Sequence, residues 1–107
     1  MSKQHAIPPR LPSDQQLIDT HCHLDMDAYA DDLDTVVRSA VAAGVGGIIT
    51  VGIDLHSSQQ AVAIARRFAG VWATVGIHPH HAAEAGPAQY TELTVLAAEK
   101  ANRVVGY

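Results

Sequence analysis

Two histidines separated by one residue, His21 and His23, are the residues of this chain best suited to chemistry. They come at the end of a short run, 17–21, that begins apolar and turns polar. Residues i and i+2 of an extended chain point to the same side, so both imidazoles can reach one ion. Neutral imidazole is a preferred ligand of zinc and similar divalent metals. The pair is either a metal site or two exposed loop histidines, and the acid Asp19 just before it favours the metal site.

Two neighbours of this pair have alternative interpretations. Cys22 lies between the histidines and points to the opposite side of an extended chain. We therefore expect Cys22 to be a small buried side chain and not a third ligand. Asp25 follows His23 by two residues and either orients a metal-bound imidazole or caps the helix that follows.

A second group of histidines, His78, His80 and His81, follows the apolar run 71–75. Five of the seven histidines thus fall in two segments directly after predicted strands. In a parallel barrel both segments face the same mouth, so we expect His78 to bind or position a substrate phosphate. A structural role is the favoured interpretation for His80 and His81. Asp54, after the second predicted strand, either joins this ring of loops or is only a helix N-terminal acid.

Short apolar runs alternate with segments of helical period from residue 17 onward. The predicted strands are 17–21, 45–51, 71–75 and 103–107. Strand, helix and strand at intervals of roughly 30 residues form βαβ units, whose right-handed crossovers give a parallel sheet. No Gly-rich phosphate turn follows the first strand, and the distinctive polar residues end separate strands, so a barrel is favoured over an open doubly wound sheet. We expect Phe68 and Trp72 to fill the core.

Three helices are expected between these strands. The first has Asp31 and Asp32 in its first turn. The second begins at Ser57 with a Ser-x-x-Gln capping box that Gln60 closes, which explains this serine better than a nucleophilic role does. The third starts at Pro87.

Composition sets outer limits on function. The chain has 107 residues of which 48% are hydrophobic, enough for an interior. Its net charge is -4 with 7 Lys plus Arg, so no basic nucleic-acid-binding patch is expected. One cysteine and no apolar run near the ~20 residues of a membrane span predict a cytoplasmic protein without a membrane partner. Residues 1–16 carry three prolines and are expected to be a flexible lead-in.

These features resemble the TatD family of metal-dependent deoxyribonucleases. The matching segments are 18–25, 43–45 with 51–54, and 75–80, within a similarity that covers about 17–107. The family is a (β/α)₈ TIM-type barrel in which two divalent ions (Mg, Mn or Zn) activate water for phosphodiester hydrolysis. The resemblance implies an α/β fold that is the N-terminal part of such a barrel, with about four strands and three helices. It also implies a DNA or other phosphodiester substrate, metal ligands at His21 and His23, and a place at the substrate mouth for His78.

The family's bridging Glu and its further His and Asp ligands have no counterpart before Tyr107. Two histidines make a weak site and four strands cannot close a barrel, so we expect this truncated 107-residue chain to be inactive alone and prone to aggregate. One alternative is another His-x-His barrel metallohydrolase, an amidohydrolase or a phosphatase of the polymerase-and-histidinol-phosphatase type. Another is a non-catalytic remnant that associates through its exposed sheet edge. Segment 76–80 favours the TatD-like hydrolase over the other metallohydrolases.

Overall fold

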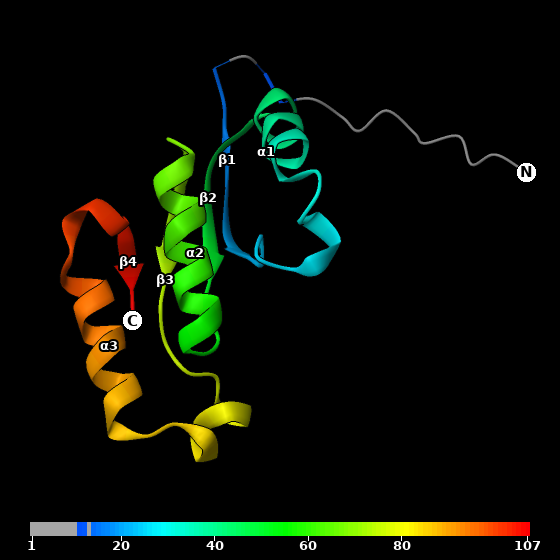
Figure 1. Cartoon of the computed structure of the whole chain (residues 1–107). Helices are drawn as coiled ribbons and strands as arrows, with labels where there is room; N and C mark the ends of the chain where they lie inside the picture. Colours follow the sequence, from blue (N-terminus) through cyan, green and yellow to red (C-terminus); the bar gives the residue numbers. More distant parts are fainter. Residues whose placement is uncertain (1–10, 13) are drawn as a thin grey trace, which may run out of the picture.

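The computed structural model describes residues 11, 12 and 14–107, and it contains one parallel sheet in the order β1-β2-β3-β4. The strands are β1 (Leu17–Cys22), β2 (Val45–Val51), β3 (Val71–Thr74) and β4 (Val104–Gly106). Each strand lies beside the next one along the chain, so every βα unit extends the sheet in the same direction (Figure 1). This is the strand order of a TIM-type barrel. The predicted lead-in at 1–16 falls largely outside the described residues.

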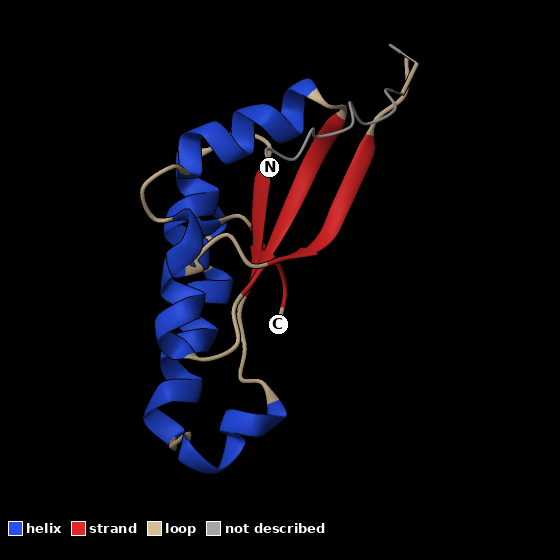
Figure 2. Ribbon diagram, turned by 90° about the vertical axis from the view of Figure 1, so that its right-hand side faces the viewer, coloured by secondary structure: helices blue, strands red, loops and turns tan. Residues whose placement is uncertain are grey.

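Three α-helices connect the strands, as predicted. They are α1 (Leu33–Ala42), α2 (Leu55–Arg67) and α3 (Pro87–Ala98). Short 3-10 helices occur at η1 (Asp27–Tyr29), η2 (Pro79–Glu84) and η3 (Lys100–Asn102). Figure 2 shows the helices gathered on one face of the sheet, while the other face of the described chain carries none. The arrangement matches the outer helical layer and inner strand layer of a barrel wall.

The hydrophobic core lies between the sheet and these helices. Its buried members are Leu24, Leu33, Val37, Ile48, Ala61, Val62, Ala65, Val71, Ala73, Val75 and Leu93. Phe68 packs against this cluster from the end of α2, as predicted. Within the described residues, no helix is both long enough and apolar enough to cross a lipid bilayer.

Trp72 does not fill this core, contrary to the prediction. Its neighbours on β3, Val71 and Ala73, are completely buried under the helices, and side chains alternate along a strand. Trp72 therefore points to the helix-free face, where its ring approaches Gly47. The guanidinium of Arg103 lies 4.7 Å from the centroid of the Trp72 ring. A five-residue apolar run identifies a strand but does not tell which of its residues face the helices.

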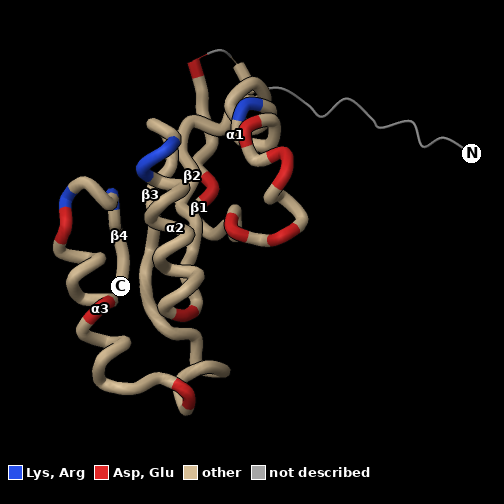
Figure 3. The backbone as a smooth tube through the Cα atoms, viewed as in Figure 1, with Lys and Arg blue, Asp and Glu red and all other residues tan. Residues whose placement is uncertain are grey.

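Charged side chains are unevenly distributed along the strand direction. Figure 3 shows the lysines and arginines of the described residues toward the end of the molecule at which the strands begin. Aspartates and glutamates occur at both ends. The rim at which the strands finish is therefore poor in positive side chains.

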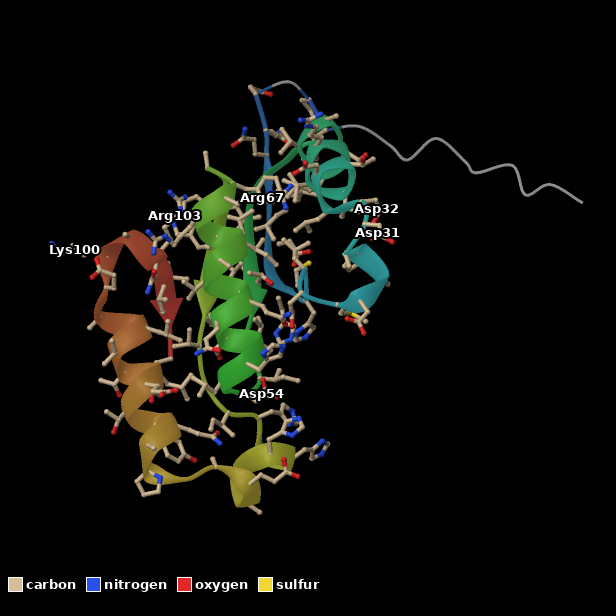
Figure 4. All side chains as sticks on the ribbon, viewed as in Figure 1. Asp31, Asp32, Asp54, Arg67, Lys100 and Arg103 are labelled. Atoms are coloured by element: carbon tan, nitrogen blue, oxygen red, sulfur yellow. The ribbon has the colours of Figure 1, made fainter. Side chains whose placement is uncertain are left out.

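The start of α2 differs from the prediction. Asp54, and not Ser57, is the N-cap residue (Figure 4). The Asp54 carboxylate accepts a hydrogen bond of 2.8 Å from the Ser57 N–H, and the Ser57 hydroxyl accepts one of 3.1 Å from the Asp54 N–H. This is a capping box shifted by three residues, with Ser57 in the third helical position and Gln60 beyond it.

Of the other two helix starts, that of α1 was misplaced and that of α3 was predicted correctly. Asp32 is the N-cap of α1, so Asp31 and Asp32 precede the first turn that they were expected to occupy. The acid in that turn is Asp34. The third helix, α3, begins at Pro87 as predicted.

A buried serine joins α2 to the ends of β2 and β3. The Ser58 hydroxyl accepts a hydrogen bond from the Gly76 N–H at 3.2 Å and lies 3.4 Å from the Gly76 carbonyl, to which it donates. Gly52, just after β2, sits so close that an added Cβ would lie 2.4 Å from the Ser58 hydroxyl oxygen. The first turn of α2 thus fixes the positions of the two loops that leave β2 and β3.

The Asp54 cap predicts a pH-dependent contribution to stability. The hydrogen bond from the Ser57 N–H lowers the pKa of the Asp54 carboxyl in the folded chain. The ionised cap therefore stabilises the fold above the ordinary carboxyl pKa, and this stabilisation disappears as the pH falls through the lower folded-state pKa. We expect Asp54→Ala to lower the free energy of unfolding by about 1 kcal/mol at neutral pH.

Urea denaturation across a pH series measures this effect. The difference between the wild type and Asp54→Ala should shrink as the pH falls below about 4. Asp54→Asn is the matched control, because asparagine caps helices well but does not titrate. A deficit in Asp54→Ala that stays constant down to the acid limit would contradict the role of the ionised cap.

Candidate metal centre

The imidazoles of His21, near the end of β1, and of His23, just beyond it, lie next to each other. Their ring centroids are 5.1 Å apart, and the ring planes meet at 78°. Both rings line a cavity of about 670 Å³ at the carboxyl ends of the strands. The geometry agrees with the prediction that the i and i+2 side chains share one side of the chain.

Cys22 packs against the hydrophobic core, as expected from strand alternation. Burial, and to a smaller degree the charge of Asp19, raises the pKa of the Cys22 thiol. Cys22 does not line the cavity that contains the two histidine rings.

The backbone of β2 sets the orientation of the His23 ring. The Nδ1 atom of His23 lies 3.2 Å from the carbonyl oxygen of Val51. A carbonyl only accepts hydrogen bonds, so this contact requires the proton on Nδ1 and leaves the lone pair on Nε2. Metal-binding histidines are commonly oriented by a hydrogen bond of this kind on the other ring nitrogen. The donor chemistry of His23 therefore fits a divalent metal.

Two backbone N–H groups fasten the same segment. The Leu24 N–H donates to the Thr50 hydroxyl at 3.1 Å, and the His21 N–H donates to the Asp19 carboxylate at 3.1 Å. Asp19 thus supports the histidine segment through the backbone. Thr50, which the sequence analysis did not single out, had one signal: it is a polar residue in an otherwise apolar strand, where a hydroxyl needs a partner.

Asp25 makes neither of the two contacts predicted for it. Its Oδ1 atom is buried and has no hydrogen-bond partner among the described residues. The helix that follows, η1, has Met26 as its N-cap. Asp25 therefore neither orients an imidazole nor caps a helix in this structure.

His78 reaches the same cavity from the loop after β3. Its Nδ1 atom accepts a hydrogen bond of 3.1 Å from the His80 N–H, so neutral His78 carries its proton on Nε2. The His80 ring packs edge-on against His78, with centroids 4.6 Å apart. His78 and His23 are thus held in opposite tautomers, one as a hydrogen-bond donor and the other with a free lone pair.

The remaining candidates lie in a separate cavity of about 310 Å³ between α2 and η2, which Asp54 and His81 line. His81 lies 3.8 Å from Glu84, and Asp54 is engaged in the α2 cap. The structure therefore does not bring Asp54 or His81 to the His21–His23 pair. Two residues of the larger cavity that sequence analysis missed are Tyr90 and Tyr107, for which the sequence gives no local signal.

The ligand set within the described residues is partial. No group of three or more His, Cys, Asp or Glu side chains that could hold an ion occurs in the part of the chain that the structure describes. A catalytic zinc normally has three protein ligands and one open position. The His21–His23 pair can therefore supply part of a metal centre.

Three comparisons relate this chain to known proteins. A family model described as TatD related DNase matches residues 18–107. A Salmonella typhimurium protein named 3'-5' ssDNA/RNA exonuclease TatD is 40% identical over 81 residues, which cover 76% of this chain and 31% of the relative. The Escherichia coli K12 protein of the same name is 36% identical over 83 residues, covering 78% of this chain and 32% of that protein.

A solved structure gives the same answer for the fold. The TatD homologue YJJV from Escherichia coli K12 superposes with a TM-score of 0.75 at 27% identity, over 83% of this chain and 34% of that one. The chain thus spans about a third of the length of the proteins it matches. Its four strands and three helices correspond to the N-terminal part of a TatD TIM-type barrel, and the chain belongs to the TatD related DNase family.

Proposed function

We propose that His21 and His23 are metal ligands of a barrel hydrolase that cleaves phosphodiester bonds in single-stranded nucleic acid. The observation that carries the proposal is the His23 ring, whose Nδ1 is engaged by the Val51 carbonyl and whose Nε2 is left free beside His21. The names of the relatives, 3'-5' ssDNA/RNA exonucleases, support the substrate class. The single cysteine fits a cytoplasmic location.

The metal supplies the chemistry that this segment lacks. A divalent ion held in part by His21 and His23 would polarise a phosphoryl oxygen and activate water for attack on phosphorus. His21 and His23 contribute neutral nitrogen ligands, which suit Mn²⁺ and Zn²⁺ better than Mg²⁺. Cys22 packs against the hydrophobic core, does not line the cavity and is not part of the proposed ligand set.

His78 is suited to bind a substrate phosphate. Its Nε2–H is a donor because its Nδ1 is occupied by the His80 N–H, and the residue lines the same cavity as the metal ligands. No lysine or arginine of the described chain lines that cavity. Within these residues, contact with a non-bridging phosphate oxygen therefore falls to an imidazole N–H and not to a long cationic side chain.

The alternatives make different demands on the same residues. Another His-x-His barrel metallohydrolase would share the metal ligands but act on a different bond, and the family match favours the nuclease. A non-catalytic remnant that associates through the sheet edge would not need the ordered His23 ring at all. A measurement of metal affinity distinguishes the non-catalytic remnant, which need not bind metal, from the two kinds of enzyme, which must.

Metal binding by the complete gene product should depend on both histidines. We expect His21→Ala and His23→Ala each to weaken Zn²⁺ or Mn²⁺ affinity by at least about tenfold, because each removes a nitrogen ligand. Isothermal titration calorimetry measures the change. His56→Ala, an exposed position on α2 outside the larger cavity, is the control and should bind like the wild type. Equal affinities in all four proteins would exclude His21 and His23 as ligands.

Nuclease assays on the complete gene product test the reaction. We expect metal-dependent release of nucleotides from the 3' end of single-stranded DNA, abolished by EDTA. His78→Ala should lower kcat/KM by about 10²-fold, since one hydrogen-bond donor to the charge that develops in the transition state contributes on that order. His81→Ala, which lies in the separate cavity, should leave the rate within about twofold of the wild type.

Residues 1–107 alone should show no activity, because the part of this stretch that the structure describes provides fewer protein ligands than a catalytic metal requires. Robust metal-dependent cleavage by monomeric material of this length would contradict that expectation. Hydrolysis of a phosphomonoester or an amide, with no cleavage of single-stranded DNA, would favour the alternative metallohydrolases.

A further inference from the structure

We propose that Thr50 is a positioning residue of the metal centre. Its hydroxyl holds the Leu24 N–H and thereby keeps the His23 ring against the Val51 carbonyl. The role given to this arrangement, which is to orient a metal ligand, rests on the proposed function. Both hydrogen bonds join protein atoms only, so they can be tested separately from metal binding.

Thr50 occupies a buried position, where a hydroxyl requires a hydrogen-bond partner. It is completely buried and lies on the same side of β2 as Ile48, which belongs to the hydrophobic core. A buried polar group is destabilising unless it is hydrogen-bonded. The Leu24 N–H is the partner that the structure gives it, at 3.1 Å. Thr50 is thus fitted to hold the backbone one residue beyond His23.

Strand pairing between β1 and β2 does not hold the backbone at His23 and Leu24. The β1–β2 ladder has a register shift between Asp19 and Cys22, and its last pair is Cys22 with Thr50. His23 and Leu24 lie beyond that pair, outside β1. The ladder therefore ends just before the residue whose ring has to be oriented.

Two successive residues of β2 replace the missing ladder. The Thr50 side chain fixes the backbone at Leu24, and the Val51 backbone fixes the side chain of His23 at 3.2 Å. The Leu24 side chain, 3% exposed, anchors the same point in the core. If the Thr50 contact is lost, the Leu24 N–H is left buried without an acceptor and the local backbone must shift. The weaker contact between the His23 ring and Val51 should then break.

The tautomer of His23 reports this contact directly. The Val51 carbonyl requires the proton on Nδ1, whereas a neutral imidazole free in water favours the proton on Nε2. Thr50→Val keeps the shape of the side chain and removes the acceptor. Thr50→Ser keeps the acceptor and removes a methyl group.

The experiment uses the complete gene product labelled with ¹⁵N-histidine, without metal, well above the pKa of a free imidazole. Long-range ¹H–¹⁵N correlation spectra identify which nitrogen of His23 carries the proton. We expect Nδ1–H in the wild type and in Thr50→Ser, and a shift to Nε2–H in Thr50→Val. Zn²⁺ affinity, by calorimetry, should fall by about 10-fold to 100-fold in Thr50→Val and recover in Thr50→Ser.

Retention of Nδ1–H in a folded Thr50→Val protein would overturn the proposal. If Thr50→Val does not fold, Thr50→Ser decides, since loss of Nδ1–H in that folded variant would equally overturn it. A wild type that shows Nδ1–H but binds no Zn²⁺ would contradict the proposed function and leave the positioning role of Thr50 to be judged by the tautomers.

Discussion

The hydrogen bond between the Nδ1 proton of His23 and the carbonyl oxygen of Val51 is the contact on which the candidate site depends. It exists because β1 and β2 are parallel neighbours, so the end of one strand lies beside the end of the other. Without it, His23 would be a loop residue with a freely rotating ring. With it, the unprotonated Nε2 is left for a ligand next to His21.

The packing between α2 and the loops after β2 and β3 restrains the chain near the His23–Val51 contact. Ser58, at the first turn of α2, bonds to Gly76 and sits against Gly52, so the chain leaving β2 has little freedom to move. The Asp54 cap fixes where that helix begins. In the loop after β3, the His80 N–H fixes the tautomer of His78. Backbone groups thus leave a free lone pair on one imidazole and a free N–H donor on the other.

The uneven distribution of charge fits the same division of roles. The lysines and arginines of the described chain lie toward the end where strands begin, and none lines the cavity that contains the histidine pair (Figure 3). Arg103 instead lies over the Trp72 ring and bonds to the Val71 carbonyl at 3.0 Å. Within the described chain, a phosphate bound in this cavity would therefore have to be held by the proposed metal and by imidazole N–H groups.

Local sequence patterns predicted the fold better than the details of the site. Strand β2 was predicted with the bounds that the structure has, because it ends in four consecutive β-branched residues, 48–51, and lies between Gly44 and Gly52. The proximity of His21 and His23 followed from strand geometry alone. The capping box was misplaced because Ser57 fits two overlapping box patterns, and only the turn of the backbone selects Asp54 as the cap.

What sequence could not supply were contacts between residues far apart in the chain. The Thr50–Leu24 bond spans 26 positions, and the His23–Val51 bond spans 28. No local periodicity reports such pairs, because they depend on the register between β1 and β2. The tautomers of His23 and His78 are likewise consequences of tertiary structure.

Crystals of the complete gene product soaked in Zn²⁺ or Mn²⁺ test the central claim most directly. Anomalous scattering should place an ion within about 2.0–2.1 Å of Nε2 of His23 and of a nitrogen of His21 when zinc is used. The Nδ1 of His23 should still contact the Val51 carbonyl. Rings turned away from each other, with no anomalous peak between them at full soaking, would contradict the account.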